Sequence, residues 1–235
     1  TIPNTVTQEL LENKYQIAKA NSIANYSFFM GANNDNLKEV LKTNGENVCG
    51  IKVFMGSSTG NMLVDDQETL SQIFKNSSLL IATHCEDEPT IKKNLVKFKT
   101  RYGDNIPFEM HPKIRSEEAC VKSTLKIIDL AKKCKSRLHV FHLSTKLESE
   151  LFEKIPLEDK KITSEVCIHH LSFNDSNYPN VILGQPVNSL ADFYTDSDTA
   201  TNSQVWERRK GRVFFVSTDQ DGFFRVGKFF SVDQA

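Results

Sequence analysis

The sequence predicts an α/β fold of the (β/α)₈ TIM-barrel type, and three observations support this prediction. Six short runs rich in apolar residues alternate with segments of helical periodicity. Most of these runs are apolar at successive positions, as strands are when helices cover a parallel sheet. No glycine-rich dinucleotide fingerprint and no phosphate-binding P-loop follows any of the six runs, which counts against open nucleotide-binding sheets and favours a barrel.

Length and composition are those of a globular protein. The chain has 235 residues, 39% hydrophobic and 25% charged, and can bury a substantial core without a disulfide scaffold. The formal net charge of -1 provides no electrostatic footprint for nucleic acid or an anionic membrane surface. The five cysteines show no CxxC pairing, which suits reduced thiols in a cytoplasmic protein. No apolar run approaches the ~20 residues needed to span a bilayer, so we expect neither nucleic acid nor a membrane as a partner.

The first half of the chain is predicted to begin with a helix and to contain three strands. Residues 7–22 open with Thr7, a residue type that favours a helix N-cap, and carry apolar residues at helical spacing. The elements predicted next are a strand at 25–30, a helix near 34–43, the strand that contains Lys52, a helix near 67–75, a strand at 79–84 and a helix at about 87–101.

The second half of the chain begins with the longest predicted helix. Ser116 is its predicted N-cap, with Glu117 and Glu118 in the first turn and lysines in the last, so the charges complement the helix dipole at both ends. The elements predicted next are strand 138–143, a helix at about 145–154, strand 162–168 and strand 212–217, with a weakly patterned region before the last strand that includes the polar loop 192–204.

Four polar residues lie at or near the ends of predicted strands. His84, His142 and Asp219 end or closely follow three of the strands, and Lys52 lies on a fourth, just ahead of a glycine- and serine-rich loop. The carboxyl ends of the strands form the active site of a (β/α)₈ barrel, so we expect these side chains to converge. Imidazole nitrogens and a carboxylate are groups that Zn²⁺ accepts as ligands. The pattern therefore indicates a zinc site.

Each of these residues also has an ordinary structural interpretation. A single buried histidine is more often a hydrogen-bonded core residue than a metal ligand. Asp219 could cap a helix or lie in a turn, and Lys52 could extend its amine out of the core along its aliphatic stem. Glu165 and the pair His169 and His170 could lie on a polar strand end. The coincidence of polar residues on four separate strands favours the metal site.

Several stretches of the sequence closely resemble the bacterial dihydroorotases of the amidohydrolase superfamily. They are GIKVFMGSSTGNMLVD, IATHCEDE, HPKIRSEEAC, LHVFHLST and SEVCIHHL, and the opening IPNT resembles that family's MPNT turn. The matching motifs follow the family's order and spacing from residue 1 to about residue 178. The resemblance implies a metal-bearing (β/α)₈ barrel that reversibly hydrolyses the cyclic amide of dihydroorotate to N-carbamoyl-aspartate in pyrimidine biosynthesis.

The resemblance also implies roles for individual residues. Lys52 matches a lysine that is carboxylated by CO₂ and bridges two Zn²⁺ ions, and its apolar surroundings favour the neutral amine that reacts. His84 and His142 match histidine ligands on the fifth and sixth strands. Asp219 matches an eighth-strand metal ligand that takes the proton of the attacking water and passes it to the leaving nitrogen. Asn4, in the IPNT match, is a predicted substrate contact. Proteins of this family commonly form dimers, so the resemblance also predicts a homodimer.

Three features depart from the family pattern. No HxH occurs, although the family takes two metal ligands from such a pair on its first strand, so residues 1–235 are interpreted as strands three to eight of a partial barrel, without the first two strands or the small flanking β-domain. After Thr218 and Asp219 the chain reads QDGFF where HAPH is expected, and 181–211 matches poorly, with Gln185–Pro186 in place of NP. These departures leave two alternatives open: a non-catalytic scaffold that keeps the barrel, and a related cyclic amidase acting on a hydantoin or allantoin ring.

Overall fold

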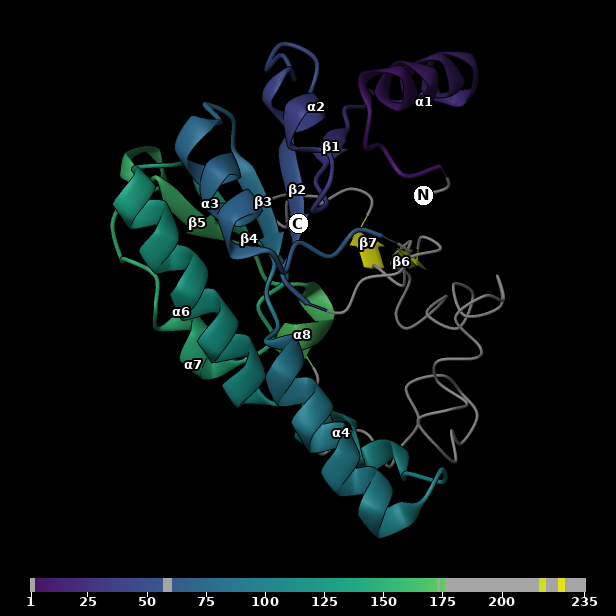
Figure 1. The fold of residues 1–235 in the computed structure, drawn as a ribbon, viewed down its shortest axis with the longest axis vertical. Helices are drawn as coiled ribbons and strands as arrows, with labels where there is room; N and C mark the ends of the chain where they lie inside the picture. Colours follow the sequence, from purple (N-terminus) through teal and green to yellow (C-terminus); the bar gives the residue numbers. More distant parts are fainter. Residues whose placement is uncertain (1–2, 57–60, 173, 176–215, 219–223, 227–235) are drawn as a thin grey trace, which may run out of the picture.

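A parallel sheet forms the centre of the protein in a computed structural model that describes residues 3–56, 61–172, 174–175, 216–218 and 224–226. Five strands lie side by side in the order in which they occur in the sequence (Figure 1). They are β1 (Phe29–Gly31), β2 (Gly50–Phe54), β3 (Ile81–His84), β4 (Leu138–Val140) and β5 (Ile162–Ser164). Parallel strands that neighbour one another in chain order, with helices between them, are the arrangement of successive strands in a (β/α)₈ barrel.

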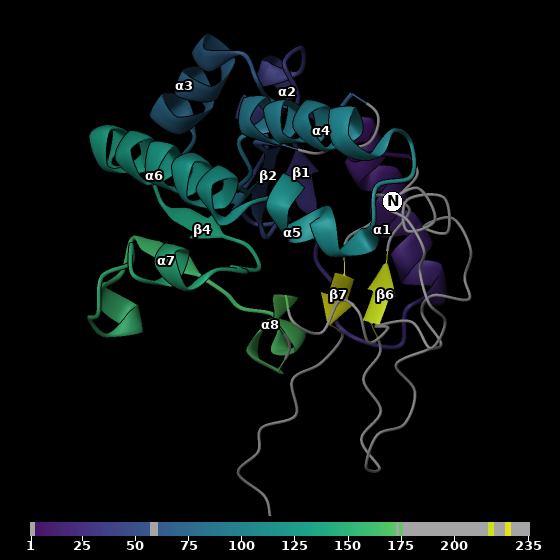
Figure 2. The same cartoon turned by 90° about the horizontal axis from the view of Figure 1, so that it is seen from below.

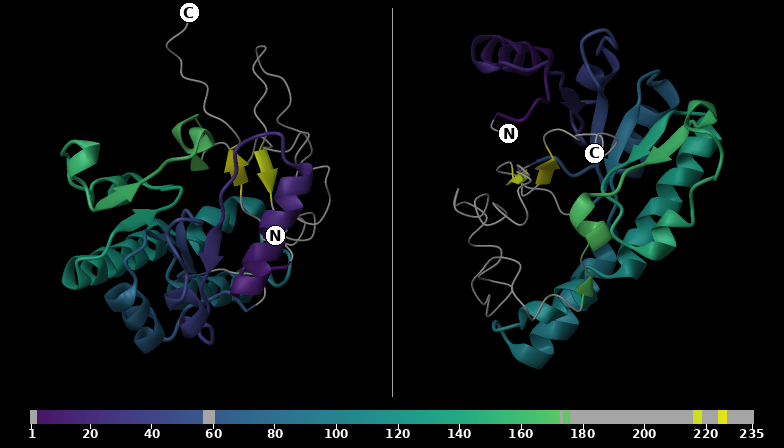
Figure 3. Two further views of the ribbon diagram at one scale, coloured as in Figure 1. Left: turned by 90° about the horizontal axis from the view of Figure 1, so that it is seen from above. Right: turned by 180° about the vertical axis from the view of Figure 1, so that it is seen from behind.

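The helices connect the strands, and the longest of them lie on one face of the sheet. They are α1 (Gln8–Asn21), α2 (Leu37–Leu41), α3 (Gln67–Asn76), α4 (Glu88–Tyr102), α5 (His111–Ile114), α6 (Glu117–Cys134), α7 (Lys146–Ser149) and α8 (Ile168–Ser172), with 3-10 turns η1 (Phe108–Met110) and η2 (Leu157–Asp159). Figure 2 shows α3, α4 and α6 together on one side of the strands. Helix α1 lies near the β1 edge, at the opposite end of the sheet from β5 (Figure 3). Within the part of the chain that the structure describes, no helix combines the length and the hydropathy that crossing a membrane requires.

The two N-caps predicted from the sequence are both present. The Thr7 hydroxyl accepts a hydrogen bond from the backbone N–H of Leu10, and the Ser116 hydroxyl accepts one from that of Ala119. Each bond satisfies one of the four N–H groups that a helix leaves unpaired at its start. Helix α6 ends at Lys135, whose left-handed conformation (φ 57°) terminates the helical hydrogen bonding.

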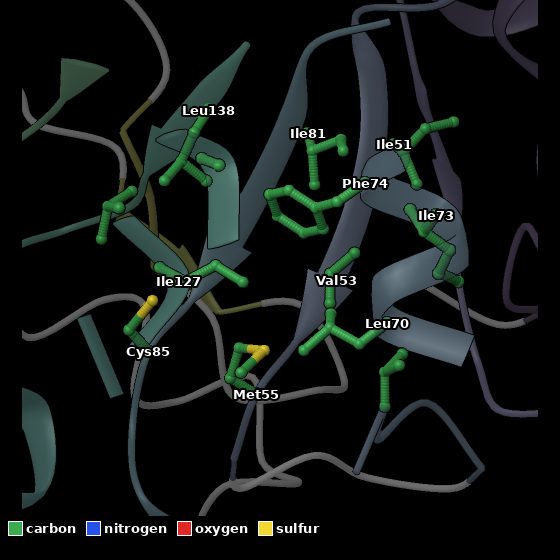
Figure 4. Packing of buried hydrophobic residues seen from close by; sticks show 14 of the residues in the cluster. Ile51, Val53, Met55, Leu70, Ile73, Phe74, Ile81, Cys85, Ile127 and Leu138 are labelled. Carbon is green, nitrogen blue, oxygen red and sulfur yellow. The ribbon is translucent and has the colours of Figure 1, made fainter. Parts of the chain in front are cut away.

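The hydrophobic core lies between the sheet and helices α3 and α6 (Figure 4). Ile51 and Val53 of β2 and Ile81 of β3 are fully buried there against Phe74 of α3 and Ile127 of α6. Full burial of an aliphatic or aromatic side chain of this size stabilises the fold by about 1.5–3 kcal/mol. Successive strand side chains point to opposite faces, so the residue between Ile51 and Val53 must point away from this core.

The second face of the sheet, which we call the inner face, carries a different set of side chains. The register places Gly31, Lys52, Ala82, His139 and Thr163 opposite one another across the five strands. In a parallel sheet such partners project from the same face. The inner face therefore carries a lysine and a histidine in one row, whereas the row beside it faces the core.

Two strands end earlier than the sequence predicts. The ladder between β4 and β5 stops at Val140 and Ser164, not at residues 143 and 168. On β4 the cause is His142, whose positive φ of 40° is incompatible with an extended strand. Beyond β5 the chain enters α8, so His169 and His170 lie on a helix and not on a strand end.

The segment predicted as the eighth parallel strand pairs differently. Its described part, β6 (Val216–Thr218), forms an antiparallel pair with β7 (Phe224–Val226) instead of joining the five-stranded sheet. Five positions separate the two strands in the sequence, and so short a connection permits antiparallel pairing but not a parallel crossover. The predictions for 181–211, including Gln185–Pro186 and the loop 192–204, lie outside the described residues.

Replacing Ile127 by alanine should destabilise the protein by about 2–5 kcal/mol, because it leaves a cavity between α6 and the sheet. Urea denaturation followed by circular dichroism measures the change. Leu125 is a matched control on the same helix, since it is 43% exposed whereas Ile127 is 0% exposed. Leu125→Ala should cost less than about 1 kcal/mol. Equal losses in the two variants would contradict the assigned core.

Candidate metal centre

Two histidines meet at the carboxyl ends of neighbouring strands. His84 is the last residue of β3, and His142 follows β4 by two positions. The ring centroids are 4.9 Å apart, and Nδ1 of His84 lies 3.1 Å from Nε2 of His142. His84 is buried, and the His142 side chain is partly buried. The structure thus brings these two predicted site residues together, as the barrel interpretation expects, while their role as metal ligands stays a prediction.

The backbone that presents His142 is strained and firmly held. A non-glycine residue at positive φ costs about 1–3 kcal/mol and persists where its surroundings hold it. On the far side of the turn, the buried carboxylate of Glu148 accepts hydrogen bonds from the hydroxyls of Thr124 (2.8 Å) and Thr145 (3.0 Å). On the near side, the N–H of Leu143 donates to the Glu165 carbonyl at 2.8 Å. These bonds tie the turn to α6 and to the residue that follows β5.

Lys52 lies in the middle of β2, on the strand that the sequence predicts for it. It pairs in register with Gly31 and Ala82, and the ladder continues for two more residues to Phe54. Its side chain lies on the inner face, with Nζ 4.1 Å from the ring centroid of Phe141 and 4.6 Å from that of Phe54. Both are cation–π distances.

These two rings also link Lys52 to the histidines. The Phe54 ring lies 6.3 Å from that of His84, and the Phe141 ring 6.2 Å from that of His142, centroid to centroid. The lysine amine is thus held against both aromatic neighbours of the histidine pair. The structure therefore places Lys52 close to His84 and His142, on the same face of the sheet.

Burial keeps the two imidazoles neutral. It lowers the pKa of His142 to about 3, and the positive charges of His84, when protonated, and of Lys52 add to the effect. Burial also lowers the pKa of His84, which the hydrogen bond to Glu86 opposes without reversing. A neutral imidazole is the form that binds a metal ion. Both histidines are therefore ready to act as ligands at neutral pH.

Glu86 and Arg115 form a buried ion pair behind His84. Oε2 of Glu86 lies 2.7 Å from Nε2 of His84, and Arg115 donates from Nε to Oε1 at 2.7 Å and from Nη2 to Oε2. Burial raises the pKa of the Glu86 carboxyl, but the hydrogen bond from His84 and the charge of Arg115 outweigh it and lower that pKa to about 2. Glu86 and Arg115 lie in the stretches IATHCEDE and HPKIRSEEAC, but no role for either residue was predicted from the sequence. The available signal was an acidic residue two positions after a strand-end histidine.

The arrangement of the two histidines fits a shared zinc ion. Two nitrogens bound to tetrahedral zinc at about 2.0–2.1 Å lie about 3.3 Å apart. The facing nitrogens of His84 and His142 are 3.1 Å apart. A carboxylate on the far nitrogen, here Glu86, is the usual partner of a metal-binding histidine. In the described ranges no three or more His, Cys, Asp or Glu side chains are grouped to hold a metal, so the pair fits part of a site.

The other two predicted site residues are less fully placed. Asn4 lies beside the carboxyl end of β1, where the carbonyl of the next residue, Thr5, accepts a hydrogen bond from the Gly31 N–H at 2.7 Å. Its predicted contact with substrate stays a prediction. Asp219 lies outside the described residues.

Two further polar residues named in the sequence analysis have structural partners. Glu165 lies 3.3 Å from Nε2 of His139, whose Nδ1 is 2.9 Å from the Thr163 hydroxyl. Nδ1 of His170 lies 3.0 Å from the carbonyl oxygen of Leu143. Glu165, the residue after β5, agrees with the strand-end interpretation, whereas His170 lies on α8 and departs from it.

Comparison with known proteins shows similarity to cyclic amidohydrolases, although no family model matches. A dihydroorotase from Methanosphaera stadtmanae is 27% identical over 178 residues, which are 76% of this chain and 40% of that protein. An allantoinase from Streptomyces avermitilis is 26% identical over 185 residues, 77% of this chain and 40% of that protein. The chain therefore spans about 40% of the length of these relatives.

A solved structure confirms the predicted fold class. The L-hydantoinase (dihydropyrimidinase) from Arthrobacter aurescens superposes with a TM-score of 0.71 at 19% identity, over 86% of this chain and 47% of that one. The chain thus has the fold of part of a (β/α)₈ barrel. In sequence it is similar both to proteins named dihydroorotase and to proteins named allantoinase.

The depressed histidine pKa values predict that acid destabilises the protein. The pKa is about 3 for His142 and about 4 for His111, both below the ordinary 6.5, chiefly because of burial. Between pH 6.5 and these values the unfolded chain binds more protons than the folded one, so the free energy of unfolding should fall as the pH drops. Urea denaturation of metal-free protein at a series of pH values measures this slope.

His111→Gln is the variant that isolates one of the two histidines, because glutamine does not titrate. Its free energy of unfolding should fall less steeply than that of the wild type between about pH 6.5 and pH 4. An unchanged slope in this variant would contradict the assignment.

Proposed function

We propose that the protein is a metal-dependent hydrolase that opens cyclic amides, and that its substrate is dihydroorotate, converted reversibly to N-carbamoyl-aspartate. One observation carries the proposal: two neutral imidazoles, His84 and His142, face each other at the carboxyl ends of adjacent strands with nitrogens 3.1 Å apart. Relatives named dihydroorotase support the choice of substrate. Because the chain spans only part of those relatives, the activity of the whole protein belongs to the proposal.

The residues proposed to hold the metal are His84, His142, Lys52 and Asp219, for two zinc ions per site. Bound zinc supplies a Lewis acid for the ring carbonyl and lowers the pKa of a water molecule. Lys52 cannot bind a cation as an ammonium. It becomes a ligand when its neutral amine attacks CO₂, forms an N–C bond and releases a proton, which leaves a carbamate anion.

The surroundings of Lys52 act on this reaction in two opposite ways. Apolar surroundings in general favour a neutral, reactive amine, and the rings of Phe54 and Phe141 place apolar atoms near Nζ. Their π faces attract the ammonium form, which opposes it. The same ring faces carry partial negative charge and do not stabilise a carbamate anion. In this proposal the carbamate is stabilised by the cations that the histidines help to hold.

Proton transfer is assigned to Asp219. In the proposal its carboxylate accepts a proton from the attacking water and then donates it to the ring nitrogen as the amide bond breaks. Asn4 is proposed to contact the ring or carboxylate of the substrate.

A hydantoin or allantoin ring is the second candidate substrate. An allantoinase from Enterococcus faecalis is 26% identical over 230 residues and covers 93% of this chain, a longer match than that to the dihydroorotase from Methanosphaera stadtmanae. All three rings share the cyclic amide on which the proposed chemistry acts.

Assays of the full-length protein on dihydroorotate, hydantoin and allantoin should show ring opening, fastest with dihydroorotate. Elemental analysis should find about two zinc ions per chain, as a two-metal site requires. Treatment with a chelator should reduce hydrolysis to background, and zinc should restore it. Faster opening of hydantoin or allantoin would establish the second candidate. Metal-free protein that opens none of the rings would instead indicate a non-catalytic scaffold.

Lys52→Ala should reduce ring hydrolysis by at least about 100-fold, more than loss of a supporting contact normally costs. Lys52→Asp and Lys52→Glu should retain more activity than Lys52→Ala, because their carboxylates can replace the carbamate. Steady-state assays at saturating zinc make the comparison, with the exposed Lys75 of α3 as control, since Lys75→Ala should be as active as the wild type. Equal activity in all three Lys52 variants would refute the bridging role.

A further inference from the structure

Arg115 stands at the start of a chain of contacts that reaches the proposed metal ligands. Its guanidinium meets both oxygens of Glu86, with Nε 2.7 Å from Oε1 and Nη2 in contact with Oε2. Oε2 of Glu86 lies 2.7 Å from Nε2 of His84, and Nδ1 of His84 lies 3.1 Å from Nε2 of His142. Arg115 itself touches neither of the facing nitrogens in this chain of contacts.

We propose that Arg115 is a positioning residue of the metal centre. Its bidentate hydrogen bonding to Glu86 fixes which nitrogen of His84 carries the hydrogen and which one faces the metal. This inference rests on the proposed function, and it adds to it a residue whose role is to orient a metal ligand. The residue acts through Glu86 and His84.

Hydrogen-bond chemistry determines the direction of the effect. A guanidinium only donates hydrogen bonds and is always charged, so both oxygens of Glu86 must accept. The nitrogen of His84 that meets Oε2 must then be the donor, which places the hydrogen on Nε2. A neutral imidazole has one hydrogen, so Nδ1 keeps its lone pair and directs it toward His142. Without Arg115, the buried Glu86 can turn or bind a proton, and the tautomer of His84 is no longer fixed.

The backbone around both partners is held in place, which lets the ion pair act as a rigid support. Asn94 of α4 donates from Nδ2 to the Ile114 carbonyl (3.1 Å) and to the Ser116 hydroxyl (3.4 Å), the two neighbours of Arg115. Gly56, after β2, lies so close to Glu86 that an added Cβ would be 2.3 Å from its carbonyl oxygen. The loops that carry the pair are therefore packed from both sides.

A second ion pair beside the first provides a matched control. Nζ of Lys122, on α6, lies 2.7 Å from Oδ2 of Asp87, the residue after Glu86. Asp87 caps α4 and accepts from the N–H of Thr90. This pair holds the same loop after β3, but its basic partner lies on α6 and its acidic partner is Asp87, not the residue that meets His84. Loss of Lys122 therefore reports the effect of removing an ion pair without disturbing the proposed relay.

The test compares Arg115→Met, Arg115→Lys and Lys122→Met in the full-length protein. Long-range ¹H–¹⁵N spectra of metal-free protein report the tautomer of His84, and competition with a chromophoric chelator reports zinc affinity. Arg115→Met should mix the two tautomers and weaken zinc binding by about 10–100-fold. Arg115→Lys should have a zinc affinity between those of the wild type and Arg115→Met, because lysine cannot make the bidentate contact. Lys122→Met should keep the Nε2–H tautomer and bind zinc within about twofold of wild type.

The outcomes separate this inference from the proposed function. An unchanged tautomer in Arg115→Met, or equal zinc affinities in the Arg115→Met and Lys122→Met proteins, would overturn the positioning role. If Arg115→Met does not fold, Glu86→Gln replaces it, with the same mixed tautomer expected and an unmixed one overturning the inference. Wild-type protein that binds no zinc would refute the proposed function, while the tautomer in metal-free protein would still decide the part played by Arg115.

Discussion

The alternation of side chains along β2 is the constraint on which the rest of the structure depends. Ile51 and Val53 are fully buried against α3 and α6, and two such burials stabilise the fold far more than one partly buried lysine destabilises it. Because strand side chains alternate between faces, this packing directs Lys52 to the inner face. A shift of one residue in the register would bury the amine in the hydrophobic core and expose both aliphatic neighbours.

Burial and hydrogen bonding together set the charge of the groups around the histidine pair. Glu86 is ionised because Arg115 and His84 bind it, and the cost of removing a carboxylate from water is offset by those contacts. At His142 burial has the largest effect and lowers the pKa to about 3, so this imidazole is neutral at neutral pH. The result is a neutral imidazole pair backed by an anion, which is the electrostatic form of a site for a cation.

Strain and support are combined at His142. Its left-handed backbone is unfavourable, yet it ends β4 and turns the imidazole toward His84. The hydrogen bonds from Thr124 and Thr145 to Glu148 hold the following turn against α6. Helix α6 packs against the hydrophobic core on one face of the sheet. It also supports the loop that presents His142 at the carboxyl end of the sheet.

The sequence by itself determined the order of the elements, the N-caps at Thr7 and Ser116 and the barrel class, since these follow from local periodicity and capping chemistry. It also identified His84, His142 and Lys52 from their positions on predicted strands. Only the tertiary structure decided that the Lys52 amine lies against the rings of Phe54 and Phe141 and that β6 pairs with β7. Only the tertiary structure reveals that Arg115 forms an ion pair with Glu86, 29 positions away in the sequence. Contacts of this kind depend on how loops and helices pack in space, and no periodicity in the sequence records that packing.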